Sequence, residues 1–111
     1  MPLSKGVRAG DFVFLSGQLG LDSTGRLAGP DIETQTRQAL ANVSHVLQEA
    51  GCTLDQVFKV TVWLTAREDF GRFNEIYAGH FAATPPVRST VVSGLVLAGA
   101  LVEIEAVAYA P

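Results

Sequence analysis

The last predicted strand, residues 101–109, carries two carboxylates on one face. Alternate side chains of an extended strand share a face, so Glu103 and Glu105 point the same way from an otherwise apolar segment. A carboxylate that is buried without a partner has a raised pKa and can act as a general acid or base near neutral pH. Two solvated residues on an exposed face, or a structural salt bridge, would show the same spacing and remain as alternatives.

Arg88 opens a strand directly after the stiff segment 84–87, Thr-Pro-Pro-Val. Proline restricts its own backbone and that of the residue before it, so Arg88 leaves this segment in a defined direction. A guanidinium binds a carboxylate through two parallel hydrogen bonds, a geometry that lysine does not reproduce. Arg88 is therefore a candidate carboxylate anchor, and an ordinary arginine at a strand end is the alternative.

A small polar group, Ser16-Gly17, stands where an earlier strand ends. The hydroxyl could bind a substrate and the glycine would allow close approach to the backbone, although a plain turn has the same composition. His45 and His80 fall inside predicted helices, so no Ser-His-Asp arrangement can be assembled, and Cys52 after a helix end is expected to be structural. These residues lack metal-ligand spacing, and no nucleotide-binding motif is present, so we expect no metal and no cofactor.

Two helices are expected to position these residues. The first spans about 32–50, with Asp31 as its N-cap and Gly51 after its end, and has one apolar stripe at helical spacing. The second spans about 68–82 and ends before the two prolines at 85–86. One stripe on each helix indicates that both lie on the same face of a single sheet.

Five stretches are predicted as strands: 7–9, 11–16, 57–64, 88–92 and 101–109. The stretch 11–16 is apolar on both of its faces and is expected to be buried on both sides. In 57–64 one face is uniformly apolar and should meet the helices, namely Phe58, Val60, Val62 and Leu64. The other face is mixed and is expected to meet another subunit. The order of elements predicts an α+β two-layer sandwich with one sheet face uncovered in a monomer.

The composition predicts one domain spanning residues 1–111. Apolar residues make up 48% of the chain and charged residues 17%, which favours a homo-oligomer over a well-packed monomer. The net charge of −3 and the scattered Lys and Arg residues argue against a nucleic-acid partner. The lone cysteine, the absence of a signal-peptide core and the absence of a membrane-length apolar run predict a cytoplasmic protein without a membrane partner.

Six segments in this order resemble the RidA/YjgF family of reactive-intermediate deaminases. They are 10–18 (GDFVFLSGQ), 31–42 (DIETQTRQALAN), 60–64 (VTVWL), 73–77 (FNEIY), 85–90 (PPVRST) and 101–106 (LVEIEA). The resemblance covers nearly the whole chain. It implies a chorismate-mutase-like fold with a mixed six-stranded sheet and two helices on one face. It also implies a homotrimer with clefts between neighbouring subunits.

The resemblance also implies a reaction, the hydrolysis of a reactive 2-imino or enamine acid to a 2-oxo acid and ammonia, without a metal or organic cofactor. Arg88 would hold the substrate carboxylate and Glu103 would position or activate water. Substrate contacts are expected from the pocket-lining positions, which are Ser16, Gly17, Asn74 and Thr90. Asn74 is expected from the adjacent subunit.

The sequence departs from the family pattern in two places, one near the N-terminus and one after Arg88. Leu3 and Lys5 stand in a segment where many of these deaminases have Pro-Tyr-Ser-Gln, so a pocket hydroxyl is missing; Thr90 stands where several members have a cysteine. The departure at Leu3 leaves open an altered substrate or a non-catalytic trimer that binds small carboxylates. An endoribonuclease, an activity attached to some members of the family, is a further alternative, against which the acidic balance of the chain counts.

Overall fold

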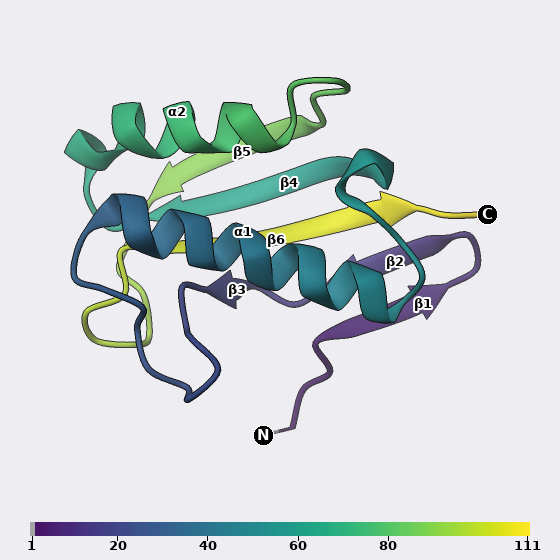
Figure 1. Ribbon diagram of the computed structural model, residues 1–111, viewed down its shortest axis with the longest axis horizontal. Coiled ribbons are helices and arrows are strands. Elements are labelled where there is room, and N and C mark those ends of the chain that lie inside the picture. The colour runs from purple at the N-terminus through teal and green to yellow at the C-terminus, as the bar shows by residue number, and fades with distance from the viewer. Residues whose placement is uncertain (1) are drawn as a thin grey trace.

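The structure, a computed structural model, describes residues 2–111 and consists of one mixed sheet and two helices (Figure 1). The elements in chain order are β1 (Gly6–Ala9), β2 (Phe12–Leu15), β3 (Gln18–Leu19), α1 (Ile32–Glu49), β4 (Val57–Leu64), α2 (Phe70–His80), β5 (Val87–Val92) and β6 (Val102–Tyr109). Short 3-10 turns at Leu54–Gln56 and Arg67–Asp69 precede β4 and α2. The predicted mixed six-stranded sheet is confirmed.

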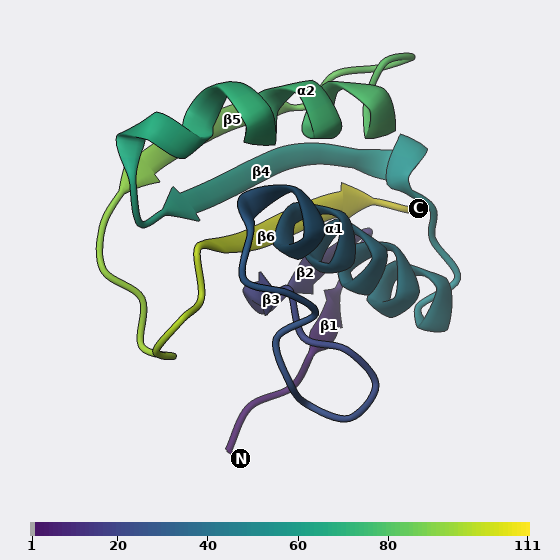
Figure 2. The same ribbon diagram turned by 60° about the vertical axis from the view of Figure 1, so that its left-hand side comes forward.

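The strands follow the order β1-β2-β6-β4-β5, and β3 pairs with β6 beyond the end of β2. Only β4 and β5 run parallel among these pairs, and α2 connects them as a crossover. Both helices cover the same face of the sheet, with α1 over the centre and α2 along the β5 side (Figures 1 and 2). The two-layer sandwich predicted from the sequence is thus the observed architecture.

Among residues 2–111, neither helix combines the length and the apolar composition needed to cross a bilayer.

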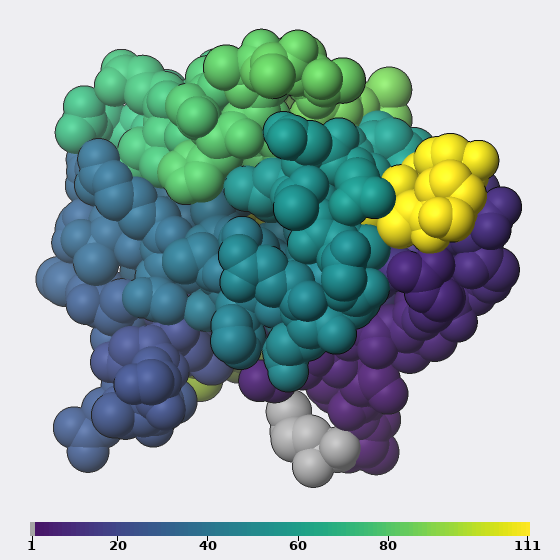
Figure 3. Space-filling model, turned by 45° about the vertical axis from the view of Figure 1, so that its right-hand side comes forward, coloured from purple at the N-terminus to yellow at the C-terminus, as the bar shows by residue number. Residues whose placement is uncertain are grey.

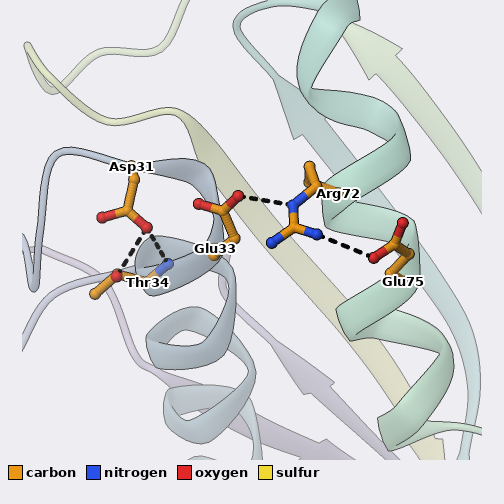
Figure 4. Close-up of polar contacts among 5 residues, drawn as sticks. All are labelled: Asp31, Glu33, Thr34, Arg72 and Glu75. Carbon is orange, nitrogen blue, oxygen red and sulfur yellow. Dashed lines mark hydrogen bonds and ion pairs between the residues drawn. The ribbon is translucent and has the colours of Figure 1, made fainter.

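The helix α1 begins where its capping residue predicts. The Asp31 carboxylate accepts hydrogen bonds from the backbone N–H of Thr34 at 2.9 Å and from its hydroxyl at 2.8 Å (Figure 4). One ion pair joins the two helices, since Arg72 of α2 lies 2.8 Å from Glu33 of α1, and a second pair, 3.2 Å long, links Arg72 to Glu75 within α2 (Figure 4). Because water screens such exposed pairs, they contribute little to the stability of the fold.

At the start of β4 the prediction that Phe58 faces the helices is wrong. The pairing of β4 with β6 shifts register between Val57 and Lys59, which is a β-bulge. Because of this extra residue, Val57 is buried and Phe58 is 40% exposed, the reverse of the uniform alternation expected from the sequence. From Val60 onward the predicted alternation holds.

The outer face of the sheet, opposite the helices, carries a group of exposed aromatic rings. In β2, Val13 and Leu15 are buried, but Phe12 and Phe14 are exposed, so burial on both sides is wrong for the single chain. Phe12 contacts three other rings at centroid distances between 5.5 and 6.4 Å, those of Phe14, Phe58 and Tyr109. This outer aromatic cluster of Phe12, Phe14, Phe58 and Tyr109 leaves apolar surface open to a partner.

The C-terminal residues, which follow the interior strand β6, lie against the β1–β2 hairpin, as the yellow and purple surfaces in Figure 3 show. The Arg8 guanidinium donates to the carbonyl of Ala110 at 2.8 Å, and the N–H of Ala110 donates to the carbonyl of Asp11 at 2.7 Å. These bonds extend the sheet beyond β6 and hold the hairpin in place.

Gln35 is a fully buried amide in α1 that ties two loops to the start of β6. Its Nε2 donates to the carbonyls of Gly29 at 2.9 Å and Gly99 at 3.0 Å, and its Oε1 accepts from the N–H of Leu101 at 2.8 Å. Gly20 makes this close packing possible, since an added Cβ there would lie 2.6 Å from the Gln35 carbonyl oxygen. One side chain thereby fixes where β6 enters the sheet.

We expect Gln35→Leu to destabilise the fold strongly. Leucine has a similar volume but leaves the two carbonyls and the N–H without partners, and each such buried group costs about 1–3 kcal/mol. Urea denaturation should therefore show a free energy of unfolding lower by about 3 kcal/mol or more. Gln48 is exposed on the same helix, so Gln48→Leu is the control and should change stability by less than about 0.5 kcal/mol. Equal effects of the two changes would contradict the assigned role of Gln35.

Candidate functional site

Arg88 and Thr90 project from the helix side of the sheet. In the parallel pair β4–β5, Arg88 lies beside Val60 and Thr90 lies beside Val62. Both valines are fully buried beneath the helices, and residues side by side in a sheet share a face. The sheet therefore places the candidate anchor under α2, on its outermost strand.

Glu103 projects from the opposite, outer side of the sheet. It lies beside Trp63 of β4 and Leu19 of β3 in the sheet register. Its neighbours in β6, Val102 and Ile104, are fully buried on the helix side. The predicted sharing of one face by Glu103 and Glu105 is confirmed. Arg88 and Glu103 are thus on opposite faces of one sheet, with β4 between their strands.

The Arg88 guanidinium is surrounded by uncharged groups. It donates to Oδ1 of Asn74 at 2.8 Å, and within residues 2–111 no carboxylate oxygen lies within 4.0 Å of its nitrogens. A half-buried arginine without a carboxylate partner keeps its charge and most of its N–H donors available to an external anion. Asn74 and Arg88 meet within one chain, so the two residues would enter any intersubunit cleft together.

Thr90 adds a hydroxyl close to the arginine. Its Oγ1 is buried and has no hydrogen-bond partner among residues 2–111. A buried hydroxyl without a partner is costly and uncommon, and is often found at sites that take a ligand. Thr90 is therefore placed on the same side of the same strand as Arg88, consistent with the predicted substrate contact.

Gly17 lies directly against the Glu103 carboxylate. A Cβ at position 17 would overlap Oε2 of Glu103 and would lie 2.9 Å from its Cδ. The short strand β3, which follows Gly17 and pairs with β6, brings the two residues together. The sequence analysis did not predict β3, since two residues carry no periodicity.

Burial raises the pKa of Glu103 above the ordinary carboxyl value, and the negative charge of Glu105 raises it further. Both causes disfavour the ionised form. Glu103 thus holds a proton more readily than an exposed glutamate, which suits a group that must accept and return a proton near neutral pH.

Ser16 already uses its hydroxyl proton within the chain. Its Oγ donates to the carbonyl of Ser4 at 2.5 Å, and its backbone N–H donates to the carbonyl of Lys5 at 2.8 Å. The hydroxyl oxygen can still accept a hydrogen bond from a ligand. The N-terminal segment that these bonds hold also carries Leu3, whose side chain is exposed.

The six predicted site residues therefore form two groups. The arginine group, on the helix side, contains Arg88, Asn74 and Thr90; the glutamate group, on the outer side, contains Glu103, Gly17 and Ser16. Two surface hollows of about 400 and 390 Å³ lie elsewhere, between α1 and α2 and beside β1, and neither is lined by Arg88 or Glu103. Within residues 2–111 no three His, Cys, Asp or Glu side chains gather in a way that could hold a metal ion.

The arrangement can be compared with known proteins. A family model described as Endoribonuclease L-PSP matches residues 1–110. The chain belongs to this family. A RutC family protein of Pyrococcus horikoshii is 42% identical over 109 residues, which cover 97% of this chain and 86% of that protein. The 2-iminobutanoate/2-iminopropanoate deaminase of Mus musculus is 39% identical over 108 residues, 96% of this chain and 80% of the enzyme.

Solved structures of L-PSP family proteins have the same fold. TdcF of E. coli with bound serine superposes with a TM-score of 0.93 at 35% identity, covering 100% of this chain and 90% of that one. The YjgF gene product of E. coli gives a TM-score of 0.91 at 33% identity, covering 97% and 87%. These matches confirm the resemblance to the RidA/YjgF proteins and the predicted α+β fold, and the L-PSP family includes imine deaminases.

We expect Gly17→Ala to lower the pKa of Glu103. Gly17 is not among the glycines with positive φ, so alanine does not strain the backbone, and the carboxylate has to move away from its buried position. Less burial favours the ionised form, and the pKa falls towards the ordinary value. Titration followed by carboxyl-carbon NMR would measure it.

The control for this substitution is Gly71→Ala, since an added Cβ at Gly71 meets nothing within 4 Å. It should leave the Glu103 pKa unchanged, whereas Glu105→Gln should lower it by removing a like charge. An unchanged Glu103 pKa in Gly17→Ala would show that the carboxylate does not lie against Gly17.

Proposed function

We propose that this chain hydrolyses reactive 2-imino acids to 2-oxo acids and ammonia, in clefts formed between subunits of a homotrimer. The observation that carries the proposal is the Arg88 guanidinium, which is half-buried, bonded to a neutral amide and without a carboxylate within reach among residues 2–111. Such a group is suited to the carboxylate of a 2-imino acid. The identity with the Mus musculus deaminase supports the same substrate class.

The proposed reaction uses two charged side chains of the chain. Arg88 binds the substrate carboxylate and draws electron density from the neighbouring imine carbon. Glu103, ionised at the start, takes a proton from the attacking water while the water oxygen bonds to that carbon. The C=N π electron pair moves to nitrogen, and Glu103 gives its proton to that nitrogen, which leaves a carbinolamine. Glu103 then takes the proton of the new hydroxyl and passes it to the nitrogen, so the C–N bond breaks and ammonia leaves as the C=O bond of the 2-oxo acid forms. Proton transfer by a placed carboxylate contributes roughly 10²–10⁴-fold to such a rate.

A second subunit is needed to complete this site. Because the arginine group and the glutamate group lie on opposite faces of one sheet, one chain cannot bring both to one substrate. In the proposed trimer, the outer face of each subunit is covered by its neighbour, and the arginine group at the β5 edge of one meets the glutamate group of the next. The serine bound to TdcF is a small carboxylate of the kind such a cleft would hold.

The first test is competition for imines. An amino-acid oxidase generates a 2-imino acid that semicarbazide traps, and the wild-type protein should lower the semicarbazone signal. Arg88→Ala should abolish this effect, and Arg88→Lys should remove most of it, since lysine keeps the charge but not the two parallel hydrogen bonds. Arg37, an exposed arginine on α1, supplies the control Arg37→Ala, which should behave as wild type.

The outcome separates the main alternatives. If wild type does not lower the semicarbazone signal but binds 2-oxobutanoate in an Arg88-dependent way, the protein is a carboxylate-binding member of the family. If the protein neither lowers the signal nor binds 2-oxobutanoate, but retards RNA in a gel shift that weakens as salt is raised, the result would favour the endoribonuclease alternative.

The intersubunit site predicts complementation between two inactive variants. Arg88→Ala lacks one half of the site and Glu103→Gln lacks the other, so each alone should be inactive. Mixed trimers place the intact Arg88 of one variant against the intact Glu103 of the other, and about a quarter of the wild-type activity should return for random mixing in a cyclic trimer. The measurement is imine competition after the variants are co-expressed or exchanged. No recovery in trimers shown to be mixed would mean that the site does not span two subunits.

A further inference from the structure

The helix α2 presents four side chains to Arg88. The guanidinium carbon lies 4.6 Å from the ring centre of Tyr77, 5.6 Å from that of Phe70 and 5.8 Å from that of Phe73. Asn74 accepts its hydrogen bond at 2.8 Å. The spacing 70, 73, 74 and 77 is that of one helix face, so a single helix determines where the guanidinium lies. From the sequence alone, the helical spacing of these aromatic residues indicates only that one face of the helix is apolar.

Tyr77 is the ring closest to the guanidinium, and it is packed between two other rings. It is buried, and its ring centre lies 5.5 Å from that of Phe73 and 4.6 Å from that of Phe81, both of which are also buried. Phe70, in contrast, is partly exposed at the start of the helix. A cation over the face of a buried aromatic ring is held more strongly than one over an exposed ring, because water competes less.

The hydroxyl of Tyr77 is not explained by packing. It is buried and, among residues 2–111, makes no hydrogen bond of regular geometry, but the Arg88 guanidinium lies near enough for a hydrogen bond to affect the phenol. A phenylalanine would fill the ring's place without burying a hydroxyl. Burial raises the pKa of Tyr77, whereas the charge of Arg88 and a hydrogen bond with it lower the pKa. Burial is the larger effect, so the phenol stays neutral. A neutral ring can hold the guanidinium without cancelling its charge, which a carboxylate partner would do.

We propose that Tyr77 is a positioning residue for the reaction, in which its ring and buried hydroxyl hold the Arg88 guanidinium so that the remaining N–H groups face the substrate carboxylate. The proposal rests on the proposed function and names a residue that the reaction would depend on without touching the substrate. Its physical basis is preorganisation: an arginine that is already oriented loses less conformational freedom on binding an anion.

The test compares Tyr77→Leu and Tyr77→Phe with Phe81→Leu. Phe81 is buried to a similar degree and touches the same tyrosine, but the rings within reach of the Arg88 guanidinium among residues 2–111 are those of Phe70, Phe73 and Tyr77. Phe81→Leu therefore reports the cost of a smaller core residue alone. The readouts are the dissociation constant for 2-oxobutanoate by calorimetry, kcat and KM for imine hydrolysis, and Tm as a check of folding.

We expect Tyr77→Leu to weaken 2-oxobutanoate binding and to raise KM by roughly tenfold, with a much smaller change in kcat, because an anchor acts on bound substrate and transition state alike. Tyr77→Phe, which keeps the ring but not the hydroxyl, should bind 2-oxobutanoate about threefold more weakly than wild type. Phe81→Leu should lower Tm without changing the dissociation constant.

Several results would overturn the proposal. Tyr77→Leu binding as tightly as wild type, or weakened no more than Phe81→Leu, would refute the role of the ring. Tyr77→Phe binding as wild type would refute the role of the hydroxyl, and this variant decides the matter if Tyr77→Leu does not fold. Wild type that binds 2-oxobutanoate but does not hydrolyse imines would refute the proposed reaction while the binding constants still test Tyr77. Wild type that does neither would refute both.

Discussion

The alternation of side chains across one sheet is the constraint on which the whole candidate site depends. The register of β5, β4 and β6 sends Arg88 to the helix side and Glu103 to the outer side. A shift of one residue in β6 would turn Glu103 to the helix side, and it would also turn the fully buried Val102 and Ile104 outward. The core therefore holds Glu103 on the outer side, because the buried side chains of β6 fix the register of that strand.

The electrostatics of the two groups differ for the same reason. Arg88 lies under α2 among neutral and aromatic neighbours, whereas Glu103 lies beside Glu105 on a face without a helix. In the proposed trimer the positive charge of a neighbouring Arg88 would lower the pKa of Glu103, opposing the effect of burial. It would thereby favour the ionised form, which accepts a proton from water. The carboxylate of a substrate bound between them would offset that cation and raise the proton affinity of Glu103 again, as the return of the proton to nitrogen requires.

Local patterns in the sequence predicted most of the fold, and contacts between distant segments account for what they missed. The ends of α1 and the alternation in β6 follow from a capping aspartate and from period-two spacing, which act within a few residues. The bulge at Val57 inverts one pair of side chains and depends on β6, which lies about fifty residues away in sequence. The contact of Gly17 with Glu103 and the stacking of Arg88 on Tyr77 also join separate segments. The residue types suggested each partner, but no spacing along the chain showed the pairing.

The outer face of the sheet carries exposed apolar side chains, and it also carries Glu103 without an arginine beside it. The outer aromatic cluster, Phe12, Phe14, Phe58 and Tyr109, is exposed on the same side of the sheet as Glu103. Burial of such rings drives association between subunits, since their apolar area is removed from water. The same association would bury Glu103 further and bring a neighbouring edge strand towards it. One apolar contact can therefore account for both the assembly and the completed site, which is why the two halves do not need to meet within one chain.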